Sequence, residues 1–439
     1  MNDAKSAGQR PFFSGGAMSR FQQLVVLVCV AINMIDGFDV LAISFAAPDI
    51  AKEWQLSPER IGVLLSAGPL GMALGSLFIS PFADWLGRRR TSLLCMSVIT
   101  LGMTLSIFAG DVSSLALCRV VTGLGIGGIL AAANTLDAEY SSDRRRASAV
   151  SLMAAGYPIG ATIFGAVAVY FLDACGWRSV FVFGAVISAL MIPLMLLGLP
   201  ESLDYLLMRN DAGALGRINA ILQKANRATL NVLPANVPRP RAVVSVFARD
   251  TRANAALICA GFFLVMFSFY FLLTWTPKIL VDLGMSTSLG VSGSVLMNFG
   301  GVLGGLMFGL GATALGVRRF GASVMVLCFF SALVFAALPA NLYWLLPVGF
   351  VTGLFMFASM SSLYALAPLI FPVEARATGT GLGIGVGRIG AVLGPYIAGL
   401  LIGGGWQRLS YTVVLTVPFV LAAFAITHIR PAFGLGERG

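Results

Sequence analysis

Two carboxylates lie within the first long apolar segment, where an acid is costly. The segment 21–48 contains Asn33-Met34-Ile35-Asp36-Gly37-Phe38-Asp39 and is otherwise apolar. A carboxylate near the middle of a membrane helix costs roughly 2.5–3.5 kcal/mol on insertion scales. Asp36 and Asp39 are three residues apart, so they share nearly one helix face, which must point into the protein. Either could bind and release a proton, and we favour Asp39, which lies deeper in the segment. The alternative is that one acid only neutralises a buried arginine.

Two arginines in later apolar segments supply the opposite charge. Arg119 lies in the segment 114–136 and Arg388 in the segment 378–402. A guanidinium holds a carboxylate through two parallel hydrogen bonds and does not lose its charge, which suits the binding of an organic anion. We therefore predict both arginines as substrate-binding residues. The alternative for each is an internal ion pair or a brace for helix carbonyls.

Aromatic side chains deep in the apolar segments could form a pocket for a flat ring. The members of this set are Phe38, Tyr157, Phe267, Tyr270, Tyr364 and Tyr396. We predict Phe38, Tyr270, Tyr364 and Tyr396 as substrate-binding residues. Packing against lipid or against another helix is the alternative role for each of them.

No other pattern in the sequence indicates catalysis. Gly123–Gly128 and Gly385–Gly390 match the dinucleotide pattern G-x-G-x-x-G, but both lie within apolar helices with no strand before them. Small residues at this spacing let membrane helices pack closely. A nucleophile–base set, a Walker loop and a cluster of metal ligands are all missing from the sequence. We predict no enzyme, no cofactor and no metal site.

The composition identifies the elements that must position these residues. Of 439 residues, 58% are hydrophobic and 11% are charged, whereas about a quarter are charged in a soluble protein. A helix that spans a bilayer needs about 20 apolar residues. The sequence therefore predicts an all-α polytopic membrane protein with twelve spans, at 21–48, 61–83, 91–109, 114–136, 147–171, 180–199, 254–275, 291–313, 320–339, 342–368, 378–402 and 409–429.

The formal net charge of +10 is distributed unevenly between the two sides of these spans. Most lysines and arginines fall on the side of the N-terminus, among them Arg88–Arg90 and Arg144–Arg146. The opposite side carries Lys52, Arg60, Arg178, Lys278 and Arg408. By the positive-inside rule both termini are cytoplasmic. The basic charge thus reflects membrane orientation, and we predict no nucleic-acid partner.

The chain divides into two six-span halves around one long connection. We predict an N-terminal tail 1–20, a bundle 21–200, a cytoplasmic central loop 201–252 that begins as helix, a bundle 253–430 and a C-terminal tail 431–439. The halves repeat short patterns at nearly one offset, since Gly71 and Gly75 match Gly300 and Gly304, and Gly176-Trp177 matches Gly405-Trp406. A parallel repeat of this kind is typical of transporters that bind substrate between their halves.

The loop after the second span resembles the signature G-x-L-A-D-R-x-G-R-R of the major facilitator superfamily. Four signature positions are retained, namely Asp84, Gly87, Arg88 and Arg89, while three differ, namely Ser80, Phe82 and Trp85. The resemblance implies a fold of two six-helix bundles. It also implies a gating role for the retained loop residues.

Within that superfamily the chain resembles the aromatic acid:proton symporters. The resemblance rests on Asp36–Asp39, Pro48–Trp54, Glu139 with Arg144–Arg146, Leu199–Ser202 and Gly385–Gly390 running into Gly394-Pro395. It implies uptake of benzoate-like acids with protons across a bacterial inner membrane. It marks Asp36, Asp39 and Arg388 as functional residues.

Together these observations predict a proton-coupled importer of a small organic anion, most simply an aromatic carboxylate such as benzoate or a hydroxybenzoate. Asp36 and Asp39 would couple the proton, and Glu139 is the next candidate. The expected partners are the anion, protons and the lipid bilayer, and the expected oligomeric state is a monomer. The alternatives are a symporter for muconate or a sugar acid, and then an efflux antiporter. A receptor, a lipid-modifying enzyme and a channel fit less well.

Overall fold

The computed structural model describes residue 13 and residues 17–142, 145–209, 211, 213–233, 252–371 and 376–429. Regular structure in these residues is helical, and twelve helices are long and apolar enough to cross a membrane. The chain is therefore an all-α, multi-pass membrane protein, as predicted. The spanning helices are α1 (Arg20–Glu53), α2 (Pro58–Leu74) with its π-helical continuation η2 (Gly75–Ile79), α4 (Arg88–Ile107), α5 (Val112–Tyr140), α6 (Arg146–Cys175), α7 (Arg178–Gly198), α11 (Arg252–Asp282), α12 (Thr287–Leu315), α13 (Val317–Ala337), α14 (Leu342–Ile370), α15 (Arg376–Gly403) and α16 (Arg408–Thr427).

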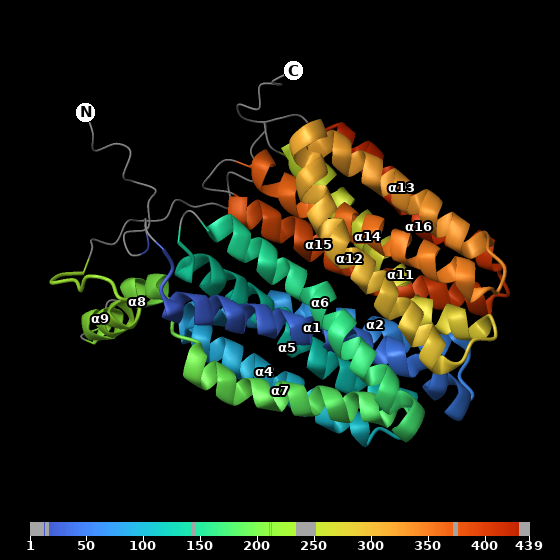
Figure 1. Cartoon of the computed structure of the whole chain (residues 1–439), viewed down its shortest axis with the longest axis horizontal. Coiled ribbons are helices and arrows are strands. Elements are labelled where there is room, and N and C mark those ends of the chain that lie inside the picture. The colour runs from blue at the N-terminus through green and yellow to red at the C-terminus, as the bar shows by residue number, and fades with distance from the viewer. Residues whose placement is uncertain are drawn as a thin grey trace.

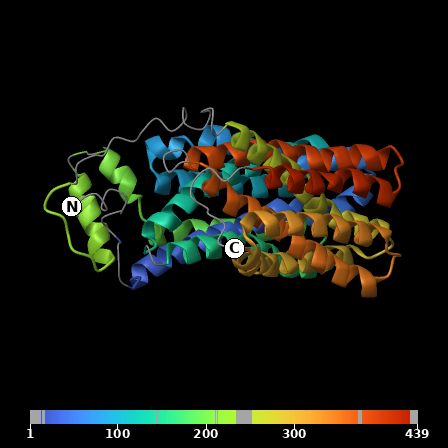
Figure 2. The ribbon, with the colours of Figure 1, turned by 90° about the horizontal axis from the view of Figure 1, so that it is seen from above.

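The helices form two halves that lie side by side. Figure 1 shows α1–α7 in blue to green as one half and α11–α16 in yellow to red as the other. Beyond one end of the first half lie α8 (Leu203–Arg209) and α9 (Ala214–Lys224), as the view from above also shows (Figure 2). These two helices agree with the expected helical start of the central loop, while residues 234–251 lie outside the described residues. We call the end with α8 and α9 the inner end and the opposite end the outer end, following the orientation expected from charge.

Helix α1 occupies the centre of the first half and carries the two acids. Its start is fixed by a capping box, in which the backbone N–H of Gln22 donates to Ser19 Oγ and the backbone N–H of Ser19 donates to Gln22 Oε1. Every residue from 35 to 48 is buried. The expectation that both acids face the protein interior is therefore confirmed.

The two halves contact each other at the outer end. Gly62 of α2 and Gly399 of α15 pack backbone against backbone, since a Cβ on Gly399 would lie 3.0 Å from the Gly62 Cα. Nearby, Thr287 Oγ1 at the start of α12 donates a 2.6 Å hydrogen bond to Asp49 Oδ1 of α1. Further along α15 toward the inner end, a Cβ on Gly381 or Gly385 would meet no atom within 4 Å. Along α15, the close contact with the first half thus lies toward the outer end, and space opens beside the helix toward the inner end.

Close helix packing through glycine gives a prediction for stability. A Cβ on Gly353 of α14 would lie 1.9 Å from the Met297 carbonyl oxygen of α12, whereas a Cβ on Gly309 of α12 would meet nothing within 4 Å. Gly353→Ala should force the two helices apart at a cost of about 1–3 kcal/mol. Gly309→Ala should be neutral or slightly stabilising, because alanine favours helix. Thermal unfolding of the purified variants checks this, and equal melting temperatures would contradict the packing described.

Candidate functional site

Arg388 of α15 lies at the centre of a group of polar side chains drawn from both halves. Its Nη1 donates a 3.1 Å hydrogen bond to the hydroxyl oxygen of Tyr270 on α11 and contacts Met72 Sδ of α2 at 3.6 Å. The charge of Arg388 also acts on Asp36 of α1 and on Tyr364 of α14. The structure therefore brings together Arg388, Asp36, Tyr270 and Tyr364, which the sequence had singled out separately.

Several polar atoms of this group are unused. Among the described residues Arg388 Nε, Asp36 Oδ1 and the Tyr157 hydroxyl of α6 have no hydrogen-bond partner, although all three are buried. Buried polar atoms without a partner cost about 1–3 kcal/mol each, so native proteins retain few of them. The arrangement offers donors from a guanidinium and a phenol beside an acid. A ligand with a carboxylate could use the donors, and the acid could bind a proton.

Aromatic rings pack against the tyrosines of this group. The Tyr157 ring lies 6.3 Å from that of Phe357, and Phe269 lies 5.0 Å from Phe357 in an edge-to-face arrangement. Tyr364 packs edge to face against Phe262 at 5.6 Å. Offset and edge-to-face pairs of this kind favour a further aromatic ring beside them. Sequence reasoning missed Phe269 and Phe357, because nothing in their spacing separates them from lipid-facing phenylalanines.

Arg119 and Asp39 form a second charged group inside the first half. Arg119 is fully buried, and its Nη2 donates a 2.5 Å hydrogen bond to the Asp39 carbonyl oxygen. Its Nη1 contacts Met103 Sδ at 3.2 Å, and its guanidinium lies 5.8 Å from the centre of the Phe181 ring. The charge of Arg119 acts on the buried Asp39 carboxyl. The contacts of Arg119 thus correspond to the internal brace that was the alternative to substrate binding.

Three predicted site residues lie away from Arg388. Phe38 is fully buried among Phe45, Phe164 and Phe183, so it packs within the first half. Tyr396 follows Arg388 by eight residues, or about 12 Å of helix rise, beside the contact with Gly62. Glu139 is buried near the inner end of α5. The contacts described for Phe38 and Tyr396 do not involve the Arg388 group.

The predicted gating loop is held by the turn that follows α7. Asp84 of α3 (Phe82–Leu86) accepts a 2.5 Å hydrogen bond from Arg88 Nη2. The backbone N–H of Arg89 donates to Glu201 Oε1 at 3.1 Å. Gly87 has φ of +98°, and a Cβ there would lie 2.4 Å from Glu201 Oε2, which explains the glycine. Glu201 had entered only as part of the Leu199–Ser202 resemblance, and its contact with the loop could not be read from the sequence.

Comparison with known proteins adds a family and several relatives. Residues 29–339 match the family model described as Major Facilitator Superfamily. The chain is 29% identical to the 4-hydroxybenzoate transporter PcaK of Acinetobacter baylyi, with 93% of this chain and 91% of that protein covered. It is 28% identical to a gallate transporter of Pseudomonas putida, covering 93% and 92%. It is 30% identical to the 3-(3-hydroxy-phenyl)propionate transporter of Escherichia coli, covering 92% and 93%.

A solved structure supports the fold. The xylose transporter XylE from E. coli, in a conformation described as partially occluded inward open, matches with a TM-score of 0.74 and 16% sequence identity. The match covers 94% of this chain and 98% of that chain. At this identity the likeness concerns the fold alone.

Proposed function

The chain belongs to the major facilitator superfamily and is a transporter rather than an enzyme, and from this premise we propose that it imports a small aromatic carboxylate together with protons. The one observation that carries the proposal is the position of Arg388. It is a buried cation whose Nε has no partner among the described residues, close to tyrosines from both halves that pack against further aromatic rings. The names of the relatives, which are transporters of hydroxybenzoate, gallate and hydroxyphenylpropionate, support the same class of substrate.

The substrate carboxylate would bind to Arg388 and Tyr270, with its ring against Tyr157, Phe357 and Tyr364. Two parallel hydrogen bonds from a guanidinium match a carboxylate in geometry and in charge. The edge-to-face rings favour a planar aromatic group over a saturated one by about 0.5–1.5 kcal/mol. A carrier of muconate or of a sugar acid would need polar side chains where Tyr157, Phe357 and Tyr364 lie. The aromatic rings at these positions therefore argue against such a substrate.

Proton coupling would follow from the position of Asp36 beside Arg388. Burial of the Asp36 carboxyl opposes its ionisation, and the positive charge of Arg388 is the influence that favours the ionised form in the free protein. A substrate carboxylate on Arg388 engages that charge, so the loaded site favours protonation of Asp36. By linkage, the bound proton strengthens substrate binding by the same factor. Geometry therefore leads us to prefer Asp36 over Asp39, whose carboxyl faces Arg119.

Alternating access would require the outer contacts to open and the inner end to close. The contact of Gly62 with Gly399 and the hydrogen bond from Thr287 to Asp49 would exist in the inward-facing state and break in the outward-facing state. The gating loop and Glu201 would bias the balance between the two states. We further propose that the protein resides in a bacterial inner membrane as a monomer, with both termini cytoplasmic.

Variants of the gating loop should change turnover more than substrate binding. Asp84→Asn removes an ion pair in which Asp84 is largely exposed, and such pairs contribute up to about 1 kcal/mol. We expect maximal uptake to fall up to about fivefold, with a nearly unchanged KM. Glu201→Gln should lower turnover as well, because Glu201 accepts from the backbone of both Arg89 and Ser202. Asp211→Asn, which breaks an exposed pair with Arg217 on the same side, is the control. A variant that loses binding but keeps its maximal rate would contradict this role.

Uptake of labelled acids by proteoliposomes tests the proposal. With a proton gradient directed inward, we expect accumulation of benzoate or 4-hydroxybenzoate above the level of protein-free vesicles. Cyclohexanecarboxylate is the matched control, since it keeps the carboxylate and the ring size but lacks the aromatic face. Equal transport of the two acids, or a preference for muconate, would exclude an aromatic site. Accumulation driven by the opposite gradient would identify an efflux antiporter.

A further inference from the structure

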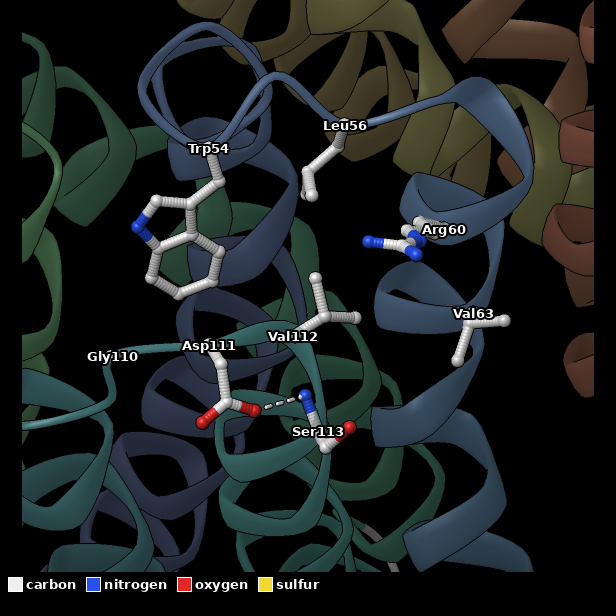
Figure 3. A pocket seen from close by; sticks show the side chains of 8 residues that line it. All are labelled: Trp54, Leu56, Arg60, Val63, Gly110, Asp111, Val112 and Ser113. Atoms are coloured by element: carbon white, nitrogen blue, oxygen red, sulfur yellow. Dashed lines mark hydrogen bonds between the residues drawn. The ribbon is translucent and has the colours of Figure 1, made fainter.

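A hollow at the outer end of the first half has no part in the proposed function. It has a volume of about 560 Å³ and lies between the turn that joins α1 and α2, the first turns of α2, and the start of α5. Figure 3 shows the eight residues that line it. The volume is within the range of roughly 300–1,000 Å³ that is typical of sites for small molecules.

The hollow presents one cation and one anion. Arg60 extends from α2 toward the space beside Trp54 (Figure 3). Its side chain is exposed, and no hydrogen bond or ion pair joins it to the described residues. Asp111 lies across the hollow and accepts from the backbone N–H groups of Ser113 and Ser114 at 2.8 and 2.9 Å. The hydrogen bonds from Ser114 hold the pKa of Asp111 below its usual value, so this carboxylate is ionised at neutral pH.

The hollow continues into an exposed apolar stripe within the spanning segments. Val63, which lines the hollow, and Leu70, two turns along α2, are each 42% exposed. On α5, Leu117 is 65% exposed and lies on the same face as Ser113, one turn away. Exposed apolar side chains within a membrane span face lipid tails. The charged hollow and the lipid-facing stripe are therefore continuous.

We propose that this hollow binds the headgroup of a zwitterionic phospholipid of the outer leaflet, with the phosphate on Arg60, the ammonium on Asp111 and one acyl chain along Val63, Leu70 and Leu117. This inference is independent of the transported substrate. Trp54 forms the wall of the hollow at the depth where indole rings favour the membrane interface.

Charge complementarity selects the class of lipid. Phosphatidylglycerol offers the same phosphate to Arg60 but carries a neutral glycerol in place of the ammonium, so it leaves the Asp111 carboxylate without a cation. A primary ammonium can donate a hydrogen bond to Asp111 Oδ2, which among the described residues accepts only from the Ser114 hydroxyl, whereas a quaternary ammonium has no N–H to donate. The site therefore favours phosphatidylethanolamine over both phosphatidylglycerol and phosphatidylcholine.

Native mass spectrometry of the full-length protein in mild detergent tests the proposal. The probes are phosphatidylethanolamine, phosphatidylglycerol and phosphatidylcholine with identical acyl chains. The wild-type protein should retain phosphatidylethanolamine best. Arg60→Gln should lower its retention by about tenfold, as expected for the loss of one charge-assisted hydrogen bond. Arg60→Lys should restore part of the retention, because lysine keeps the charge.

Asp111→Asn separates the role of the anion from that of the helix cap, since asparagine caps a helix as well as aspartate does. It should remove the preference for phosphatidylethanolamine over phosphatidylcholine. The control is Lys52→Gln. Lys52 is an exposed cation at the outer end of the protein that does not line the hollow, so this variant should retain lipid as the wild type does. The melting temperature of each variant identifies any that is misfolded.

Three results would overturn the proposal. The first is undiminished lipid retention by a folded Arg60→Gln variant. The second is a preference for phosphatidylglycerol that Asp111→Asn leaves unchanged, which would indicate a site for phosphate alone. The third is displacement of the lipid by benzoate, which would make the hollow a site for soluble aromatic acids.

Discussion

Arg388→Lys is expected to raise the KM for substrate by about 10- to 100-fold, the amount that corresponds to a lost hydrogen bond to a charged group. Lysine keeps the positive charge but lacks the planar fork that grips a carboxylate. Because Arg388 contacts Tyr270 and Met72 rather than a structural carboxylate, the variant should still insert and fold. Initial uptake rates over a range of substrate concentrations check the effect.

Two control variants sharpen this result. Tyr270→Phe removes one neutral donor and should raise the KM by about two- to tenfold. Arg119→Lys should leave the KM of the correctly folded fraction nearly unchanged, because Arg119 donates to the Asp39 carbonyl oxygen and lies against Phe181. A normal KM in Arg388→Lys, or a larger KM change in Arg119→Lys, would mean that the substrate carboxylate binds Arg119 and not Arg388.

Asp36→Asn should abolish accumulation driven by a pH gradient while exchange of labelled for unlabelled substrate across the membrane continues. Asparagine has the shape and neutrality of the protonated acid but cannot release a proton. The carrier with bound substrate can therefore still move between its two states, which is all that exchange requires. Net accumulation also requires the empty carrier to release its proton before it returns, and the asparagine variant cannot do so. Counterflow in vesicles without a pH gradient measures the exchange, and uptake with a gradient measures the coupling.

The control for this variant is another buried acid of the same half. Asp137 of α5 is buried and has no hydrogen-bond partner for its carboxyl oxygens among the described residues, yet it does not belong to the Arg388 group. Asp137→Asn should keep both accumulation and exchange. If Asp39→Asn alone abolishes accumulation, the proton belongs to the pair of Asp39 and Arg119. If Asp36→Asn and Asp39→Asn both still concentrate substrate, the proton is carried elsewhere, with Glu139 as the next candidate.

The sequence predicted the fold well, because the thickness of the bilayer requires an apolar segment of about 20 residues for each spanning helix, and such segments can be recognised without knowledge of tertiary contacts. It also identified Asp36, Asp39, Arg119 and Arg388, since a charge inside an apolar helix stands out whatever its partner is. It could not assign the pairs. Which acid faces which arginine depends on how α1 is rotated against α5 and α15, and no spacing along the chain fixes that rotation.

The aromatic residues were harder to predict for the same reason. Phe38 lies between the two acids in sequence but packs toward α6 and α7, while Phe357 packs against Tyr157 of the Arg388 group. Both are phenylalanines in apolar helices, so composition cannot separate them. Glu201 is separated from Arg89 by more than a hundred residues, and only the folded chain brings the two together.

The most direct test of the central claim is the direction of proton movement that accompanies the substrate. Vesicles with no initial pH gradient are loaded with a pH-sensitive dye, and labelled 4-hydroxybenzoate is added outside. Protein-free vesicles and vesicles with Arg388→Lys correct for the passive entry of the neutral acid. A symporter coupled through Asp36 acidifies the lumen as substrate enters, and Asp36→Asn does not. Entry of the substrate without acidification, or with alkalinisation of the lumen, would contradict the account.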